Sequence, residues 1–369
     1  MLDVALRNLA FAYGAAGSNR DFALRGVTLT FPRSTHTAIA GPPACGASTL
    51  LRLIAGTLRP QSGDVILGQR LVTEVKASRR PLLSVTSEVE VAGRWSVQHA
   101  LVAAVRTRTL DRVDRHREYA LAAEKWDLVQ LLDRKLATLA ATELLRVQLA
   151  RIELLRPAIL VADRLFESAS AAARVGLADT FYRTMRVFGT TVVSAPSSRE
   201  ELAFSDQVVV LARGTVVQSG TPAELFARPE SDAAAVATGE VDLVPVTIRG
   251  TTVQSVIGSW EVDPAPFQGS GVALVRPGDF APARAGQDSD FVFGVEEAGF
   301  ADGRWIAHGV LSGGVTLRVE LPREVQVHKG RLLALRYDAA RFRLLPREHL
   351  QTSPTSVPRD AVPPMAESR

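Results

Sequence analysis

The stretch Gly-Pro-Pro-Ala-Cys-Gly-Ala-Ser-Thr at 41–49 constrains the fold of this chain more than any other feature. It follows the apolar run His-Thr-Ala-Ile-Ala at 36–40, which is typical of a buried strand. The segment after it, 48–55, has leucine and isoleucine at helical spacing and ends at Gly56, a suitable C-cap. A strand, a glycine-containing turn and a helix in this order form a context in which backbone amides bind phosphate. The stretch therefore predicts a phosphate-binding turn inside an α/β fold.

The stretch departs from the phosphate-loop pattern G-x-x-x-x-G-K-[ST] at one position. Gly41 and Gly46 occupy the glycine positions, and Ser48 supplies the hydroxyl, followed by Thr49. Ala47 stands where lysine is expected, so the ammonium group that contacts the β- and γ-phosphates is missing. A charge-assisted contact contributes about 1.5–3 kcal/mol, and its loss predicts an affinity about tenfold to a hundredfold weaker.

Other residues of the stretch are also expected to weaken phosphate binding. Pro43 has no backbone N–H to donate, and the Cβ of Ala44 opposes the backbone conformation that glycine takes there. Cys45 is either a small filler or a thiol made reactive by the helix N-terminus. The amides and dipole of that helix remain. We therefore expect weak cofactor binding by the residues Gly41, Pro42, Pro43, Ala44, Cys45, Gly46, Ala47, Ser48 and Thr49.

Composition restricts the class of protein. The chain has 369 residues, 46% of them hydrophobic and 22% charged, enough for two or three globular domains. Its net charge of +4 comes from scattered arginines and lysines, and without a nucleic-acid motif we expect no nucleic-acid partner. We find no signal peptide and no run approaching the ~20 apolar residues that span a bilayer. Its single cysteine fits a reducing cytoplasm.

Helical and strand patterns alternate up to residue 228. Helical periodicity runs through 95–135, with Tyr119, Ala122, Trp126 and Val129 on one face. A second helical run, 142–156, stops at Pro157, and three apolar strand candidates follow at 158–163, 190–195 and 207–214. Near-continuous apolar strands separated by helices predict a parallel sheet.

The pattern changes beyond residue 228. Residues 229–242 are polar and alanine-rich and are predicted as a linker. Residues 243–347 contain short alternating segments separated by glycine and proline, which predict a small all-β domain. The Pro/Ser-rich end, 348–369, is predicted to be disordered.

The order of these features carries a family resemblance. The phosphate-type loop is followed by LAATELLRVQLARIELLRPAILVADRL at 139–165 and by RGTVVQSGTPAELFARP at 213–229. Over about residues 1–345 the chain resembles the ATP-binding subunit of an ABC transporter. The β domain is similar to the OB/TOBE-like C-terminal domain of maltose-, spermidine- and ferric-iron-type importers. The resemblance implies a P-loop NTPase domain at 1–228, with a RecA-like parallel sheet and a helical subdomain at about 88–157.

The resemblance also implies cofactors and partners. ATP and Mg²⁺ would be the cofactors, bound weakly or not at all. Membrane permease subunits and a second ATP-binding subunit, in a homodimer or a heterodimer, would be the partners, with a solute-binding protein acting indirectly. The chain would then lie peripherally on the cytoplasmic face of the membrane.

Three positions match the family's nucleotide-binding residues. Tyr13 stands where an aromatic stacks on adenine, although an ordinary edge-strand tyrosine gives the same pattern. Ser48 and Asp163 stand where Mg²⁺ is held, although Asp163 would also serve as a helix cap. The position of the glutamine that senses Mg²⁺ does not match, because it aligns with Ser87, whose shorter side chain could not reach in the same way.

The catalytic positions do not match. The signature Leu-Ser-Gly-Gly-Gln appears as Leu-Ala-Ala-Thr-Glu at 139–143, where the acid of Glu143 would repel a polyphosphate. Arg164 replaces the glutamate that activates water, and arginine cannot act as a general base. It is either a salt-bridge arginine or a cation that stands in for the loop lysine. Ala195 replaces the switch histidine, and Ser170 replaces an aspartate at the subunit turn.

These substitutions leave three functions open. The first is a degenerate ATPase subunit with a structural or regulatory role in an importer-like complex. The second is a working transporter motor that hydrolyses ATP despite the losses. The third is a stand-alone protein whose β domain binds a small ligand or regulator. We expect no catalytic residue in the first case.

Overall fold

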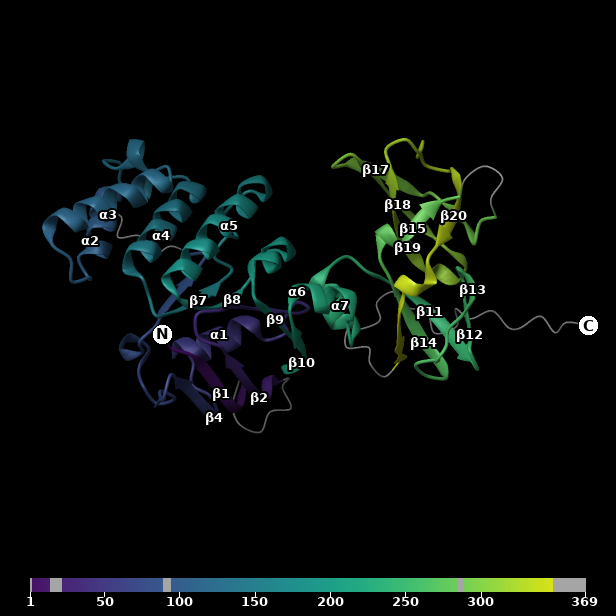
Figure 1. The fold of residues 1–369 in the computed structure, drawn as a ribbon, viewed down its shortest axis with the longest axis horizontal. Coiled ribbons are helices and arrows are strands. Elements are labelled where there is room, and N and C mark those ends of the chain that lie inside the picture. Colours follow the sequence, from purple (N-terminus) through teal and green to yellow (C-terminus); the bar gives the residue numbers. More distant parts are fainter. Residues whose placement is uncertain (1, 14–21, 89–93, 284–287, 348–369) are drawn as a thin grey trace, which may run out of the picture. The chain divides into compact units, whose positions relative to one another are not determined.

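The computed structural model describes residues 2–13, 22–88, 94–283 and 288–347 of this chain. It divides into two compact units, Met1–Ala223 and Glu224–Arg369 (Figure 1). The predicted tail at 348–369 lies outside the described residues. Within the described residues, no helix combines the length and the apolar character needed to cross a bilayer.

The first unit is built on a six-stranded sheet whose inner strands are parallel, as the apolar strand patterns predict. Only its edge strand β10 runs antiparallel to its neighbour. In spatial order the strands are β10 (Thr215–Gly220), β9 (Gln207–Ala212), β3 (His36–Ala40), β8 (Thr191–Ala195), β7 (Ile159–Asp163) and β6 (Leu83–Thr86). A second, antiparallel sheet has the order β2 (Phe22–Phe31), β1 (Val4–Ala12), β4 (Ser62–Leu67) and β5 (Arg70–Leu71).

Helix α1 (Ala47–Ala55) lies between these two sheets and contacts β2, β7 and β8. Its apolar side chains are almost fully buried, which explains why a nine-residue helix is stable here. Gly56 ends it in a left-handed conformation (φ 81°) and donates its N–H to Arg52 O and Leu53 O, as the predicted C-cap requires.

The buried arginine Arg80 completes that helix end. It follows the short 3₁₀ turn η1 (Ala77–Arg79). Its Nη1 donates to Leu53 O and Ile54 O, at 2.7 Å each, and its Nε donates to Val75 O at 3.0 Å. A guanidinium has enough donors to satisfy several terminal helix carbonyls at once. Burial lowers the pKa of Arg80, which nevertheless remains a cation.

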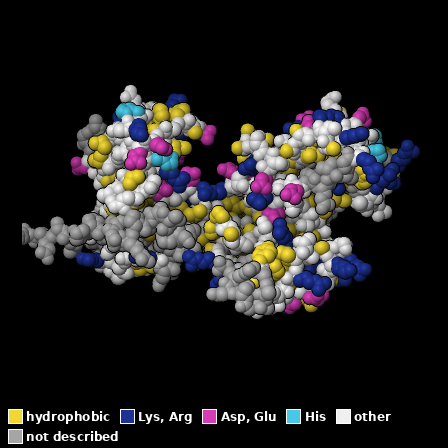
Figure 2. All heavy atoms as spheres, turned by 180° about the vertical axis from the view of Figure 1, so that it is seen from behind, with side chains coloured by type: hydrophobic (Ala, Val, Ile, Leu, Met, Phe, Trp, Pro, Cys, Tyr) yellow, Lys and Arg dark blue, Asp and Glu magenta, His cyan; other side chains and the backbone are white. Residues whose placement is uncertain are grey.

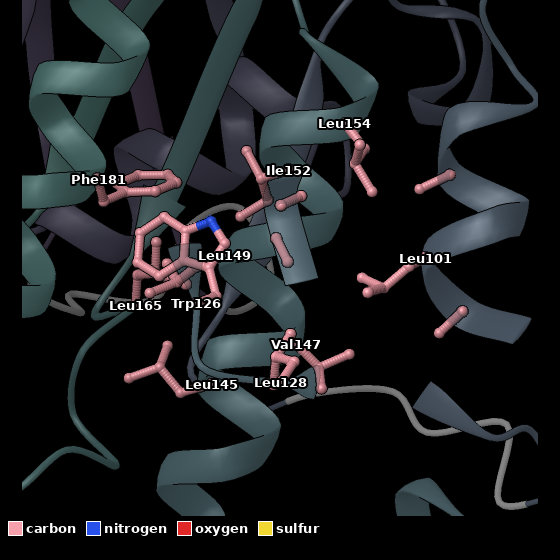
Figure 3. Close-up of a cluster of buried hydrophobic side chains, with 14 of the residues drawn as sticks. Leu101, Trp126, Leu128, Leu145, Val147, Leu149, Ile152, Leu154, Leu165 and Phe181 are labelled. Carbon is pink, nitrogen blue, oxygen red and sulfur yellow. The ribbon is translucent and has the colours of Figure 1, made fainter. Parts of the chain in front are cut away.

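Four helices cover residues 97–188 of the first unit, joined by the 3₁₀ turns η2 (Val129–Leu131) and η3 (Leu136–Thr138). They are α2 (Val97–Val105), α3 (Arg112–Lys125), α4 (Ala141–Leu155) and α5 (Ala171–Phe188). Figure 3 shows the cluster at their centre, where the indole of Trp126 lies beside Phe181 and Leu149. The indole N–H donates to Glu153 Oε2 at 2.7 Å, so its polar atom is satisfied inside the cluster.

The predicted helix face is wrong at one residue, Val129. Tyr119, Ala122 and Trp126 are buried as the periodicity predicts. Val129 is half exposed, because α3 ends at Lys125 and Val129 belongs to the following 3₁₀ turn. The 3.6-residue period therefore does not extend to it.

The second unit carries three antiparallel sheets, in agreement with the predicted all-β domain. The largest has the order β13 (Gly258–Glu261), β12 (Thr252–Ser255), β11 (Asp242–Arg249), β14 (Gly269–Val275) and β21 (Arg343–Pro346). The others are β15 (Phe280–Pro282), β20 (Leu332–Tyr337) and β16 (Phe291–Gly294), and β17 (Glu297–Ala301), β18 (Arg304–Val310) and β19 (Thr316–Pro322). Their inner faces share one apolar core.

The boundary between the units differs from the predicted one. The division follows Ala223 rather than residue 228, within helix α6 (Pro222–Ala227). The predicted linker at 229–242 contains helix α7 (Asp232–Thr238), whose alanines are buried. Ala235 packs against Val272, Leu274 and Leu345, so the small methyl groups of α7 serve close packing against the sheet. Alanine-rich composition alone does not distinguish such a helix from a linker.

We predict that Arg80→Ala lowers the free energy of unfolding of the first unit by about 2–4 kcal/mol, because buried carbonyls at the end of α1 lose their donors. Urea unfolding followed by far-ultraviolet circular dichroism measures this, since the four long helices lie in the first unit. Arg79→Ala is the matched control, because the Arg79 side chain is exposed. Equal stability of the two variants would contradict the capping role.

Candidate functional site

The candidate site lies at the carboxyl end of the parallel sheet. Strand β8 pairs with β3 on one side and with β7 on the other. Asp163, the last residue of β7, is directly opposite Ala195, the last residue of β8. The loop 41–46 leaves the carboxyl end of β3 and leads into α1. The sheet therefore gathers the predicted loop, the acidic strand end and the switch position at one edge, where α/β proteins bind ligands.

The loop backbone has positive φ at three positions, two of them glycines. Gly41 has φ 156°, and a Cβ there would lie 2.1 Å from Leu211 O of β9, so no side chain fits. Gly46, before the first turn of α1, has φ 105°. Ala44 has φ 62°, so it adopts the left-handed conformation that its Cβ was expected to oppose. An alanine pays roughly 1–2 kcal/mol for that conformation, and the surrounding fold holds it there.

Cys45 is a buried part of the loop wall. Its backbone N–H donates to Pro42 O at 3.0 Å, and its side chain packs into the core beside α1. Burial raises the pKa of the Cys45 thiol, which disfavours the thiolate. The filler interpretation of Cys45 is therefore favoured over a reactive thiol.

The two predicted Mg²⁺ ligands meet. The Ser48 hydroxyl donates to Asp163 Oδ1 at 3.0 Å. A hydroxyl and a carboxylate at this separation fit Mg²⁺, which binds proteins through one or two oxygen ligands and takes the rest from water and phosphate. Among the described residues no group of three or more His, Cys, Asp or Glu side chains could hold a metal by itself. A cation at Ser48 and Asp163 would therefore depend on phosphate oxygens.

Tyr13 lies beside the loop. Its hydroxyl is 3.0 Å from the hydroxyl of Thr49, in the first turn of α1. Its ring meets Phe11 edge-on at 4.9 Å, and about half of the side chain, 49%, is exposed. An exposed aromatic anchored at the loop is suited to stacking on a flat ligand, although the hydroxyl contact alone gives Tyr13 a structural role.

Arg164 is held by an acid that the sequence analysis did not identify. Its backbone is left-handed (φ 48°), and its N–H donates to Ala195 O at 2.8 Å. Its Nη1 donates to Glu167 Oε1 at 3.1 Å, and the Ser87 hydroxyl donates to Glu167 Oε2 at 3.2 Å. Glu167 therefore connects Arg164, where the resemblance expects the water-activating glutamate, with Ser87, where it expects the Mg²⁺-sensing glutamine. The opposite charges three residues apart at 164 and 167 were the available signal.

These contacts favour the salt-bridge interpretation of Arg164. Both side chains of the pair are about half exposed, so the ion pair contributes little to stability. The ion pair nevertheless engages Nη1 of the Arg164 guanidinium with Glu167. The hypothesis that Arg164 replaces the loop lysine has no contact to support it among the interactions described here.

The polar groups of the signature-like segment, 139–143, also find their partners within the chain. Helix α4 begins at Ala141, and the backbone N–H of Ala140 donates to Glu143 Oε2 at 2.8 Å. Arg134 Nη1 lies 3.5 Å from the other oxygen of Glu143. A carboxylate in the first helical turn is favourable there, so Glu143 caps its own helix. Ser170 likewise caps α5, accepting from Ala173 N at 3.4 Å.

A buried hydrogen-bonded chain lies behind the switch position. Ser194, just before Ala195, has its hydroxyl 2.8 Å from His36 Nε2, and His36 Nδ1 is 3.1 Å from Phe204 O. The carbonyl must accept, so Nδ1 carries the proton and Nε2 accepts from Ser194. The His36 ring stacks on Tyr182 at 4.0 Å between centroids. Burial lowers the pKa of His36 to about 4, which keeps the ring neutral.

Glu201, in the 3₁₀ helix η4 (Arg199–Phe204), is the second unexpected titratable group. Its side chain is almost fully buried, with 2% exposed, and Oε1 accepts from Ser197 N at 3.1 Å. Burial raises the pKa of Glu201 to about 7, against the opposing effects of the Ser197 amide and the Arg174 charge. The segment after the switch position is therefore fixed by a carboxyl group that titrates near neutrality.

We predict opposite pH effects for these two groups. As pH falls from 7 to 4.5, the folded protein gains a proton at Glu201 that the unfolded chain does not take up, so folding is favoured by about 3 kcal/mol. As pH falls from 6.5 to 4, the unfolded chain protonates its histidine while folded His36 stays neutral, so folding is disfavoured by about the same amount.

Urea unfolding between pH 4.5 and 7 tests this pair. Relative to the unmodified chain, Glu201→Gln should lose stability as pH falls, and His36→Gln should gain it. Curves for both variants that run parallel to that of the unmodified chain would contradict these assignments. The difference between each variant and the unmodified chain cancels the contribution of every other carboxyl group.

Comparisons with known proteins show which family and which proteins this chain resembles. A family model described as ABC transporter matches residues 24–166. The chain is 26% identical over 351 residues to the sn-glycerol-3-phosphate import ATP-binding protein UgpC 3 of Agrobacterium fabrum, covering 93% of this chain and 98% of that protein. A UgpC protein of Brucella abortus is 30% identical over 232 residues, covering 63% of this chain and 65% of its own length.

A solved structure shares the fold of the first unit. The dimeric ATP-binding cassette MJ0796, in a post-hydrolysis state bound to ADP and Pi, matches with a TM-score of 0.52 at 18% identity. The match covers 59% of this chain and 98% of that one. Residues 24–166 therefore resemble an ABC transporter cassette, the chain shares its fold with a solved ATP-binding cassette over 59% of its length, and nearly the whole chain is similar to import ATP-binding proteins of the UgpC type.

Proposed function

We propose that this chain is the ATP-binding-cassette subunit of an importer-like complex and acts there as a structural or regulatory component rather than as a motor. The observation that carries the proposal is Arg164, at the position where the resemblance expects the water-activating glutamate. Its guanidinium bonds to Glu167. A permanently protonated group cannot accept a proton from water, so the site lacks a general base at that position.

Two further positions support the loss of hydrolysis. Ala195 has no side-chain hydrogen-bonding atom with which to contact a γ-phosphate, and its carbonyl accepts from Arg164 N. Ala47 begins α1 without the loop cation. These losses fall on different elements, so a single compensating residue does not restore them together.

Residual nucleotide binding is part of the proposal. Ser48 and Asp163 are positioned to hold Mg²⁺ against phosphate oxygens, and the first turn of α1 adds backbone amides and its dipole. Tyr13 offers an exposed ring beside the loop. Mg²⁺ would supply charge neutralisation of the phosphates. We infer that ATP binds weakly and that binding requires Mg²⁺.

The proposed complex follows the family resemblance. Its other members would be permease subunits, a second ATP-binding subunit and, indirectly, a solute-binding protein. The relatives named above are import ATP-binding proteins for sn-glycerol 3-phosphate, which suggests a sugar-phosphate-like solute. The chain would then sit peripherally on the cytoplasmic face of the membrane. Co-purification with a permease, after crosslinking in the native cell, tests this assembly.

A working motor is the second candidate. The retained contact between Ser48 and Asp163 favours it, because these groups serve the metal in a hydrolysing site. The relatives' names as import ATP-binding proteins point the same way. Hydrolysis would then need a general base other than residue 164.

We predict that the purified chain hydrolyses ATP no faster than the double variant Ser48→Ala/Asp163→Ala. The reason is the missing base at 164, whose function a metal site alone does not replace. Phosphate release, measured with and without Mg²⁺, is the readout. Turnover above that control, purified identically, would establish the motor function instead.

We also predict that Ala47→Lys tightens Mg²⁺–ATP binding about tenfold to a hundredfold, by restoring a charge-assisted phosphate contact. Titration of a fluorescent ATP analogue measures the affinity. Ala47→Met is the matched control, because it adds a side chain of similar length without charge. A gain shared by both variants, or absent from both, would show that the loop does not cradle phosphate.

A further inference from the structure

A groove of about 740 Å³ opens between α2 and α3 in the first unit. It contains none of the residues assigned above to the nucleotide site, since all its lining residues lie between Gln98 and Tyr119. Its volume is within the ~300–1,000 Å³ of small-molecule sites. Figure 2 shows Lys/Arg and His side chains gathered at the right-hand end of that view, where α2 and α3 lie.

The polar lining of the groove has one sign of charge. Arg106, Arg112 and Arg115 line it together with His116, and none of its lining residues is acidic. Arg115 Nε donates to Asp111 O at 3.1 Å, which fixes that side chain along the start of α3. Three guanidinium groups without a carboxylate in the lining favour an anion.

Two acids of α3 and its N-cap, Asp111 and Glu118, are engaged elsewhere, whereas Asp114 lies beside the lining residues on α3 and the charge of Asp133 acts on Tyr119. Asp111 Oδ1 accepts from the backbone N–H of Asp114 at 2.8 Å, as the N-cap of α3. Both oxygens of Glu118 accept from Arg156, and one also accepts from Arg108 at 3.0 Å. Asp111 and Glu118 therefore have partners of their own, and the lining itself carries three arginines and no acid.

The rest of the lining is apolar. Val102 and Val105 of α2 face Val113 and Tyr119 of α3 across the groove. Val113 is 76% exposed although it is a β-branched apolar residue in the first turn of a polar helix. The Tyr119 ring is buried, and its hydroxyl is hydrogen-bonded by the Gln98 side chain. An apolar surface beside three arginines matches a ligand with an apolar body and an anionic end.

We propose that the groove between α2 and α3 binds a phosphate-bearing amphiphile, with the phosphate on the arginines and the apolar body on the valines. Guanidinium groups bind phosphate oxygens in bidentate geometry, which a lysine would not reproduce. Two sources carry this chemistry: the headgroup region of an anionic phospholipid and a soluble phosphate ester with an apolar body. The site is independent of ATP binding and of hydrolysis.

Isothermal titration of the full chain with four probes tests the site. They are dihexanoyl phosphatidylglycerol below its micelle concentration, phenyl phosphate, inorganic phosphate and the zwitterionic dihexanoyl phosphatidylcholine. We expect one or both of the first two to bind at least tenfold more tightly than the last two. Tighter binding of the phosphatidylglycerol assigns a lipid source, and tighter binding of phenyl phosphate assigns a soluble ester. Equal affinity for all four, or no binding, would overturn the proposal and favour a polypeptide segment as the occupant.

Matched variants separate the groove from overall charge. Arg112→Gln/Arg115→Gln should weaken the preferred probe at least tenfold, since two charge-assisted contacts are lost. Arg117→Gln/Arg183→Gln makes the same change of net charge at exposed arginines outside the groove and should leave affinity unchanged. Equal losses in both pairs would show non-specific attraction and sink the proposal. Circular dichroism melting confirms that each variant is folded.

Discussion

The arrangement of the candidate site depends on one parallel ladder, in which β8 is hydrogen-bonded to β3 and to β7. This ladder fixes Asp163 opposite Ala195 and sets the end of β3 at the same edge. The turn that follows must then pass against β9, where the carbonyl of Leu211 leaves no room for a side chain at Gly41. Backbone pairing and the glycine at position 41 thus position the loop, and neither requires a lysine at position 47.

The charges of the site are paired inside the chain. Arg164 bonds to Glu167, and Glu143 accepts from the backbone of its own helix and lies near Arg134. In a hydrolysing cassette the equivalent groups would be directed at nucleotide, water or a second subunit. Side chains that serve local contacts instead are compatible with a fold that persists while its chemistry changes. The Ser48–Asp163 contact, by contrast, joins the two positions at which the family resemblance expects Mg²⁺ to be held.

Much of this arrangement could be predicted from the sequence, because it depends on local patterns. Apolar runs before glycine or acid gave the parallel strands, and the glycine spacing gave the turn. The spacing of 164 and 167 offered a signal for the ion pair, but the contact of Glu167 with Ser87 and the burial of Glu201 depend on the tertiary fold. The left-handed Ala44 is imposed by the loop against the preference of alanine, and the buried alanines of α7 resemble a linker in composition.

The Arg164–Glu167 pair also makes the effect of a substitution at position 164 depend on the residue at position 167. Restoring glutamate at position 164 alone would place a second carboxylate beside Glu167, with repulsion where there is now attraction. The shared contact of Glu167 with Ser87 extends this dependence to a third position. A glutamate at position 164 would therefore be electrostatically less favourable beside Glu167 than the present arginine. Positions 87, 164 and 167 are therefore coupled, so the electrostatic effect of a substitution at one of them depends on the residues at the other two.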